Sequence, residues 1–432
     1  MSRQSKIGFW AAVLMNINII VGAGILAMTQ SMAATAGAAS FLAWPMIGLL
    51  VFPVVWCIAQ ASRVFPGEGG IYNYCAKGIN PTAGFVAQWA YLLGYMGTAT
   101  TLTLVLKDAL VHKAGLTIVG EYSMLFNTAV IVVFTLLNML DVSKISKIQS
   151  GLTLLKLLPL VVAIGLLPFF FSVNVSYAPV DFGLIAMTLP SAIFALWGFE
   201  ACVSISHLLK DGAQSVGRVV LMAFALVIVL YTLFHFSLIH IMGAKQLATH
   251  GAALFPQFLG FDANIVNALG LGILGAIIIS YMNSIFGVTL GNMSNLYTLA
   301  KNKLITCSSA LTTTNKQARP VTAGIAVAVV GWAMLYFIDK LSISVAITNV
   351  GVSTAFVLTL VALFLHFWKK RNMLQLAVTL LGFASCAMII YYSWMDISPD
   401  ATERLLYASP LAVGLVIGLV MNSVATCKKK TK

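Results

Sequence analysis

The sequence predicts an all-α membrane protein with twelve transmembrane helices, and two observations point to this fold class. Of the 432 residues, 60% are hydrophobic and 9% are charged, whereas soluble domains are about half apolar and a quarter charged. So few charges cannot cover a water-facing surface, which excludes a soluble enzyme and a disordered chain. The apolar runs are also continuous over about twenty residues, as membrane helices require and the shorter, alternating strands of β-barrels do not.

Twelve apolar runs long enough to cross a bilayer follow one another along the chain. We place them at Ile7–Thr29, Ser40–Ala61, Thr82–Leu106, Met124–Leu140, Ile148–Phe171, Phe182–Leu208, Val219–Met242, Ile265–Leu290, Pro320–Ile338, Ile343–Trp368, Met373–Trp394 and Leu405–Ser423. No composition shift or long linker separates them, so we expect a single domain over residues 1–432. The first run is too long for the apolar part of a cleavable signal peptide, and we expect none.

The basic residues predict the orientation of these spans. With the N-terminus inside, nineteen of the 25 lysines and arginines fall in cytoplasmic segments and five in outer segments. This asymmetry places both termini in the cytoplasm, and we expect a multi-pass protein of the inner (plasma) membrane. The net charge of +13 is therefore a topology signal, and no nucleic-acid partner is expected. The six cysteines show no metal-ligand spacing, so we expect no metal and no structural disulfide.

Lys156 is a charged residue deep within the fifth span. It follows Lys147 by nine residues, which puts it about 13 Å into a hydrocarbon layer about 30 Å thick. A lysine at such a depth costs about 2.5–3.5 kcal/mol on the insertion scale and is a functional candidate. It either gains and loses a proton within the bundle or stays charged and holds helices together.

Glu200 occupies a similar depth in the sixth span, ten residues before Lys210. Gly198 precedes it by two positions, between Trp197 and Phe199. Glycine allows a helix to unwind, and an unwound turn exposes backbone groups that a ligand can satisfy. A carboxylate beside such a break can bind an amine, take up a proton, or serve only as a protonated structural residue.

The first span contains a second candidate break, after Asn16 and Asn18. Its residues are Val21, Gly22, Ala23, Gly24 and Ile25. Glycine interruptions at matching positions of two halves are the best sequence pointer to a transporter site, and spans one and six match if five helices are repeated. The N-terminus of a half-helix would then face a substrate carboxylate. Carbonyl groups and Glu200 would face an amine, so an amino acid fits both.

Four segments resemble, in the expected order, motifs of the amino acid–polyamine–organocation transporter superfamily. Gly22–Gly24 resembles the G-[SA]-G of the first helix, and Pro66–Tyr74 resembles the P-x-x-G-G-x-Y-x-Y that follows the second. Phe194–Ala201 resembles the sixth-helix motif with its G-[FLV]-E, and Lys147–Gln149 ends a basic loop like the one before the fifth helix. Together these motifs and the twelve spans cover the whole chain.

The resemblance implies the leucine-transporter-type fold. Two inverted repeats of five helices would occupy residues 7–171 and 182–368, helices one and six would be discontinuous, and helices eleven and twelve would follow at 373–423. We expect a monomer or homodimer in the bilayer, without a cofactor and without enzymatic activity.

The resemblance also implies roles for individual residues. Gly22–Gly24 would bind the substrate carboxylate and Trp197–Gly198 its amine, while Tyr91 would line the pocket. Phe194 would be an aromatic gate and Phe286 a second one; ordinary aromatic packing is the alternative for Phe194, Phe286 and Tyr91. Lys156 resembles the fifth-helix lysine of proton-coupled members, whereas the antiporters have a small apolar residue there.

Two departures from the family pattern bear on the substrate. The acidic-rich tail after helix six is replaced by residues 207–212, and Ile19 stands where some antiporters have asparagine. Both put close substrate identity in doubt. Because of Lys156, we expect a secondary transporter for an amino acid or a related amine that works by proton-coupled symport, with Lys156 and Glu200 carrying the coupling. An amino acid or polyamine antiporter is the alternative, and a membrane amino acid sensor is a remote one. An intramembrane enzyme is not supported, because no nucleophile–base pair or metal cluster lies in the spans.

Overall fold

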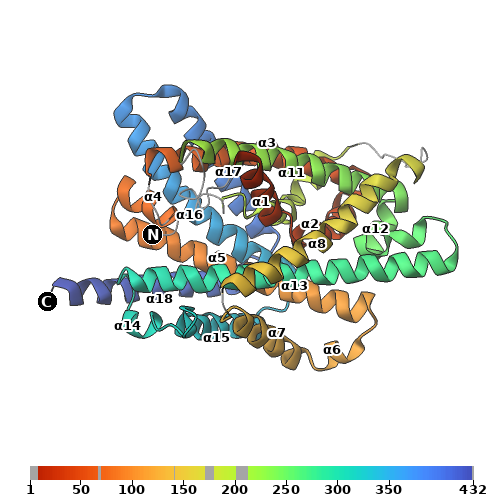
Figure 1. The fold of residues 1–432 in the computed structure, drawn as a ribbon. Helices are drawn as coiled ribbons and strands as arrows, with labels where there is room; N and C mark the ends of the chain where they lie inside the picture. The colour runs from red at the N-terminus through yellow and green to blue at the C-terminus, as the bar shows by residue number, and fades with distance from the viewer. Residues whose placement is uncertain (1–7, 67–69, 141, 171–179, 201–212, 431–432) are drawn as a thin grey trace.

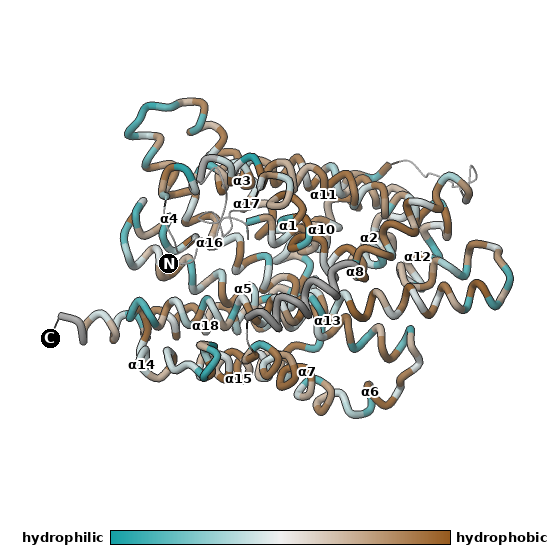
Figure 2. Tube along the Cα trace, viewed as in Figure 1, coloured by the Kyte–Doolittle hydropathy of each residue, from teal (hydrophilic) through white to brown (hydrophobic). Residues whose placement is uncertain are grey.

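The computed structural model describes residues 8–66, 70–140, 142–170, 180–200 and 213–430, and it contains helices but no β-strand in these residues. The helices pack side by side as a bundle, and both marked chain ends lie at the end of the bundle that also carries α4 and α14, whereas α12 lies at the opposite end (Figure 1). Hydrophilic segments gather in turns at the two ends of this bundle (Figure 2).

The first half of the chain forms α1 to α8. The bounds are α1 Phe9–Ile20, α2 Ala23–Ala36, η1 Gly37–Leu42, α3 Ala43–Val64, α4 Gly70–Gly78, α5 Pro81–Asp108, the π-helical turn η2 Ala109–Lys113, α6 Thr117–Glu121, α7 Ser123–Leu137 and α8 Val142–Phe170.

The second half of the chain forms α9 to α18. The bounds are α9 Phe182–Met187, α10 Leu189–Leu196, α11 Ala213–Met242, α12 Ala244–His250, η4 Ala252–Phe258, α13 Ala263–Lys301, α14 Ser308–Leu311, α15 Val321–Phe337, α16 Leu341–Lys370, α17 Met373–Met395 and α18 Ala401–Lys430.

Seven helical segments of the described chain are long and apolar enough to cross a membrane, and four shorter apolar helices accompany them. The long segments are Gly24–Val64, Pro81–Lys113, Ser215–Met242, Ala263–Lys301, Leu341–Lys370, Met373–Met395 and Ala401–Cys427; the shorter ones are Phe9–Ile20, Ser123–Leu137, Leu155–Phe169 and Val321–Phe337. The protein is thus an all-helical, multi-pass membrane protein.

The predicted C-terminal end of the eighth span is wrong. We expected it to stop at Leu290, where the apolar run stops, but α13 continues to Lys301. The added turns carry Asn292, Ser294 and Asn295, which line an internal cavity. Polar residues there face the protein rather than lipid, so hydropathy alone ends the helix too early.

A close helix contact joins α5 to α16 through glycines. A Cβ atom added to Gly351 would lie 2.7 Å from the Cα of Gly94, and one added to Gly97 would lie 2.9 Å from the Thr348 hydroxyl. Small residues let membrane helices approach closely and gain dispersion contacts where no hydrophobic force acts between them. The backbones of α5 and α16 are therefore in direct contact at mid-length.

Candidate functional site

The predicted interruption of the first span is present, because α1 ends at Ile20 and α2 begins at Ala23. In the sixth span, α10 ends at Leu196, and the residues after it form a turn in which Gly198 has a φ of +107°. That backbone conformation is open to glycine at little cost. The rest of the predicted span, 201–208, lies outside the described residues, as do residues 207–212.

The two breaks touch each other. A Cβ on Gly24 would lie 2.6 Å from the Cα of Ala195, and one on Gly198 would lie 3.2 Å from the side chain of Ile19. Asn16 also donates a hydrogen bond from Nδ2 to the carbonyl of Phe199, at 3.2 Å. The end of α1 and the start of α2 are thus packed against the end of α10 and the turn beyond it.

Tyr231 on α11 satisfies backbone groups at both breaks. Its hydroxyl lies 3.1 Å from the carbonyl oxygen of Ile20 and 3.2 Å from that of Ala195, and its side chain is fully buried. The last carbonyls of a helix have no partner within the helix, and leaving one buried and unpaired is costly. Nothing in the sequence around Tyr231 pointed to this role, since a tyrosine in an apolar run reads as packing.

A cavity of about 530 Å³, the central cavity, opens beside the breaks. Six residues that the sequence placed at the site line it: Gly22, Gly24, Tyr91, Phe194, Trp197 and Gly198. Lys156 also lines the cavity, as do residues that sequence reasoning missed, namely Asn18, Tyr95, Thr98 on α5 and Asn283, Ser284 and Asn292 on α13. The cavity runs along α13 as far as Asn295, toward the end of the bundle that carries the termini.

Glu200 lies behind the cavity wall. Its Oε1 accepts hydrogen bonds from the hydroxyls of Tyr91 (2.8 Å) and Tyr95 (2.6 Å), and its Oε2 accepts one from the backbone N–H of Gly198 (3.1 Å). Only 4% of Glu200 is exposed. Three donors suit an ionised carboxylate, which is an acceptor only. The two tyrosines line the cavity and separate the carboxylate from it, so Glu200 shapes the site through them.

Trp197 lines the cavity, but the hydrogen-bond partner that fixes its indole lies outside the cavity lining. Its Nε1 donates to Oδ1 of Asn349 on α16, at 2.7 Å, and the amide of Asn349 in turn donates to the Pro190 carbonyl and the Ser393 hydroxyl, both at 3.0 Å. The whole chain of bonds is buried. It holds the turn after α10 against α16 and α17.

Lys156 projects from α8 into the central cavity and is 5% exposed. Its ammonium donates to the backbone carbonyl of Asn18, in the last turn of α1. No ion pair joins it to another described residue. A buried ammonium held by a neutral carbonyl keeps part of its desolvation cost, and its one hydrogen-bond partner among the described residues belongs to the broken helix.

The remaining predicted site residues lie apart from the cavity or are not described. Val21 and Ile25 are buried in the core and do not line the cavity; nothing is described of the Ala23 side chain. Phe286 points away, with its ring 6.2 Å from that of Phe134 and 1% of its surface exposed. Phe286 lies on α13, but on a face of that helix that packs against Phe134 and does not line the central cavity.

Three asparagines of the central cavity keep an unused acceptor. The side-chain oxygens of Asn18, Asn283 and Asn292 are buried and have no hydrogen-bond partner within the described chain. Buried amide oxygens nearly always find a donor. These oxygens are therefore polar atoms of the cavity wall whose hydrogen bonds are left unmade within the described chain.

A second cavity of about 570 Å³ lies beyond the breaks, toward α12. The two cavities approach on three helices, since the nearest lining residues are Gly24 and Ala27 on α2, Leu102 and Leu104 on α5, and Asn283 and Tyr281 on α13. Positions two or three residues apart are separated by about 3–4.5 Å along a helix. One thin barrier thus divides two spaces that lie in line.

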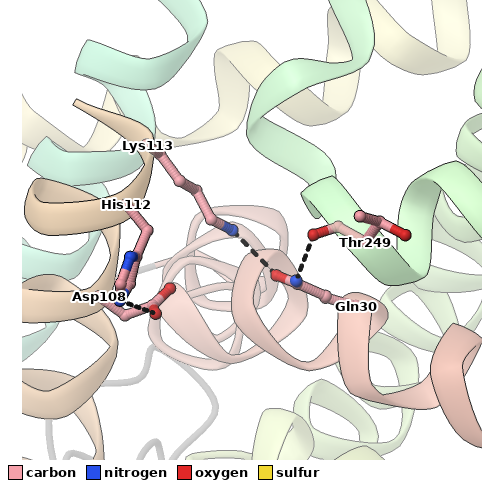
Figure 3. A network of polar contacts seen from close by, with 5 residues as sticks. All are labelled: Gln30, Asp108, His112, Lys113 and Thr249. Carbon is pink, nitrogen blue, oxygen red and sulfur yellow. Dashed lines mark hydrogen bonds and ion pairs between the residues drawn. The ribbon is translucent and has the colours of Figure 1, made fainter. Parts of the chain in front are cut away.

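The wall of the second cavity contains a polar link between three elements. Lys113 on η2 donates from Nζ to Oε1 of Gln30 on α2, at 3.0 Å, and Gln30 donates from Nε2 to the carbonyls of Ala248 (3.2 Å) and Thr249 (3.3 Å) on α12 (Figure 3). Gly251 follows with a φ of +71°, and a Cβ there would lie 2.5 Å from both the Gln30 oxygen and the Lys113 nitrogen. The link closes this side of the cavity.

Comparison with known proteins gives one family and several named relatives. Residues 7–419 match the family model described as amino acid permease. An arginine/agmatine antiporter of Chlamydia pneumoniae is 28% identical over 256 residues, which cover 54% of this chain and 52% of the relative. A putative arginine/ornithine antiporter of Escherichia coli (strain K12) is 24% identical over 291 residues, which cover 62% and 63%. The chain spans about half to two thirds of the length of these curated relatives.

Proposed function

The chain belongs to the amino acid permease family, and from this premise we propose that it is a secondary transporter that exchanges amino acids or related amines across the membrane. The observation that carries the proposal is the pair of cavities in line, divided by a barrier one turn thick. A barrier this thin can open toward one side of the membrane after access from the other side has closed, as alternating access requires. The family and its named relatives are transporters rather than enzymes.

Exchange is the mode that the relatives support, since two of them are named antiporters. Uptake by exchange needs a counter-substrate on the far side. The match to each relative is partial, so their substrates are starting points for this chain: arginine and its amines are the first compounds to try.

Proton-coupled symport, our expectation from the sequence, remains as a second candidate because of Lys156. Its ammonium lines the cavity and bonds the backbone of α1. Loss of the proton would remove the charge that strengthens the bond to the Asn18 carbonyl and so loosen α8 from the broken helix. A protonation step would in this way be tied to the position of a gate element, whereas an exchanger has no need of it.

The substrate pose follows from the breaks. The N-terminus of α2 has no side-chain cap, so its first N–H groups are available to a substrate carboxylate. The hydroxyls of Tyr91 and Tyr95, polarised by Glu200, and the carbonyls of the turn at Trp197–Gly198 would receive the ammonium. Phe194, which lines the cavity from α10, would close over the bound molecule as a gate.

The proposed architecture is twelve spans in a single domain, with inverted repeats at 7–171 and 182–368 and two further helices at 373–423. Helix pairings support it. If α5 corresponds to α13 and α8 to α16, the contact of α5 with α16 has its counterpart in the contact of α13 with α8, and both contacts are extensive. In the same scheme α3 corresponds to α11 and α7 to α15, and the two helices of each pair contact each other. The charge asymmetry supports cytoplasmic termini, with the second cavity outside.

The test uses the full chain in proteoliposomes and carbon-14-labelled arginine, agmatine and a labelled mixture of L-amino acids. Exchange predicts uptake only into vesicles that are preloaded with unlabelled compound. Uptake into empty vesicles that depends on an inward proton gradient would instead establish symport. Absence of flux in both, with binding retained, would overturn transport and leave a membrane sensor. A Gly291→Trp variant is the control for the path, because Gly291 lines the central cavity, a Cβ there meets nothing within 4 Å, and the indole would narrow the cavity.

A further inference from the structure

The second cavity is large enough for a small ligand and has a mixed polar lining. Its volume of about 570 Å³ lies within the usual range of ligand pockets, about 300–1,000 Å³. We propose that this cavity is a second binding site, specific for a free amino acid in its zwitterionic form. The proposal rests on the proposed function for the ligand class, and it adds a site that the breaks do not contribute to.

The first observation is a buried hydroxyl that faces the cavity without a partner. Tyr281 on α13 is 3% exposed and lines the second cavity. Its hydroxyl forms no hydrogen bond with any described residue, and the hydroxyl oxygen is open to the cavity. A buried tyrosine hydroxyl usually finds a partner. The partner here must come from the content of the cavity.

The second observation is that two carboxylates of the lining lack a firm cation. Asp108 reaches only the imidazole of His112, at 3.9 Å, and both side chains are more than half exposed. Asp339 forms no ion pair within the described chain. A pair at that distance between solvated groups contributes little. Asp108 and Asp339 are therefore able to accept an ammonium group.

The third observation is that the lysines of the same lining are held by neutral oxygens. Lys107 donates to the Ser123 hydroxyl at 2.9 Å, and Lys113 donates to the Gln30 amide at 3.0 Å. Figure 3 shows the Lys113 ammonium directed at Gln30 while Asp108 is directed at His112. Each ammonium has three N–H donors, so Lys113 keeps capacity for a carboxylate.

Opposite charges thus line one space without neutralising each other. An amino acid zwitterion would place its ammonium at Asp108 and the Tyr281 hydroxyl, and its carboxylate at Lys113. A simple diamine would match the carboxylates and leave the lysine unpaired. The lining therefore selects for a ligand that carries both charges, and such a ligand would wait about one helical turn from the central cavity.

The experiment is equilibrium dialysis of the purified full chain in detergent against a carbon-14-labelled mixture of L-amino acids, up to millimolar concentration. The wild type should bind about two molecules per chain. The double variant Asp108→Asn, Tyr281→Phe should bind about one, and Gly291→Trp, which places an indole at the wall of the central cavity alone, should also bind about one. Combining all three substitutions should abolish binding. Glu121→Gln removes an exposed carboxylate of α6 outside the cavity and should bind as the wild type does.

The outcomes separate this site from the central one. One bound molecule that Gly291→Trp abolishes and the double variant retains would overturn the second site and leave the proposed function standing. No bound label in any variant would overturn both. In the Gly291→Trp background, unlabelled 1,4-diaminobutane should displace label at least tenfold less effectively than unlabelled amino acids. Equal displacement would overturn the zwitterion assignment. Tyr281→Phe alone removes one oxygen atom, so it serves if the double variant fails to fold.

Discussion

The hydroxyl of Tyr231 lies 3.1 Å from the carbonyl oxygen of Ile20, the last residue of α1. The same hydroxyl is 3.2 Å from the carbonyl of Ala195, near the end of α10. One side chain from an unbroken helix therefore fastens both broken helices. A movement that separates them must release at least one of these contacts.

Replacing Tyr231 with phenylalanine should loosen this fastening without changing the shape of the core. An unpaired buried carbonyl costs about 1–3 kcal/mol, and we expect the KM of exchange to rise about tenfold while the chain still folds. The measurement is counterflow kinetics in proteoliposomes. Tyr336→Phe, on the exposed face of α15, is the matched control and should change nothing. An unaltered KM for Tyr231→Phe would show that the contact is packing alone.

Replacing Glu200 with glutamine should weaken transport without loss of folding. Glutamine can still accept hydrogen bonds from Tyr91 and Tyr95, but the negative charge that polarises both hydroxyls is gone. We expect kcat/KM to fall about 10- to 100-fold with a melting temperature within a few degrees of the wild type. Glu121→Gln is the charge-matched control. Full activity of Glu200→Gln would reduce this glutamate to a packing role.

The same carboxylate also predicts a coupling energy. Glu200→Ala leaves two hydroxyls without an acceptor, so its effect and that of Tyr95→Phe should not add. A double-mutant cycle on thermal stability should give an interaction of about 0.5–3 kcal/mol. Additive effects would contradict the 2.6 Å contact between Tyr95 and Glu200.

Replacing Lys156 with alanine should abolish any dependence of uptake on pH that arises inside the membrane. The reason is that Lys156 is the one lining residue of the central cavity, among the described residues, that belongs to the Lys, Arg, His, Asp or Glu side chains. Uptake is compared from pH 5.5 to 8.5 at fixed substrate gradient. Lys245→Ala, on exposed α12, is the control. Unchanged pH dependence in Lys156→Ala would refute the role of this lysine in coupling and leave plain exchange.

Replacing Gln30 with alanine should open the second cavity. It removes the bonds that tie α2 to Lys113 and to α12. A cysteine at Ala27, partly buried in the cavity wall, should then react at least several-fold faster with a membrane-impermeant maleimide. Gln246→Ala on α12 is the control. If the rate is the same with and without Gln30, the link does not limit access.

Replacing Phe194 or Phe286 with alanine separates the two proposed gates. Phe194 lines the central cavity, so its loss should raise passive leak of label from loaded vesicles with little loss of stability. Phe286 is packed on Phe134, so its loss should destabilise the fold by about 3–5 kcal/mol and leave the KM unchanged. Leak from Phe286→Ala with normal stability would restore it as a gate.

The sequence predicted the breaks because glycine at Gly22, Gly24 and Gly198 is a local signal. It predicted Lys156 and Glu200 because a charge in an apolar run is visible without a structure. It could not predict Tyr231 or Tyr281, since a tyrosine among apolar residues looks the same whether its hydroxyl is bonded or free. The sequence also placed Glu200 in the substrate pocket. The two tyrosines that separate it from the central cavity lie on α5, more than a hundred residues earlier in the chain, so the residues around Glu200 do not indicate them.

The glycine contact between α5 and α16 fixes what can move. Gly94 and Gly351 leave no gap for one backbone to slide past the other, so spin labels on these two helices should report the same separation whatever is bound. The separation of α5 and α16 would then be a fixed reference, against which spectroscopic distances to α1, α2 and α10 show how far each of these helices moves during turnover.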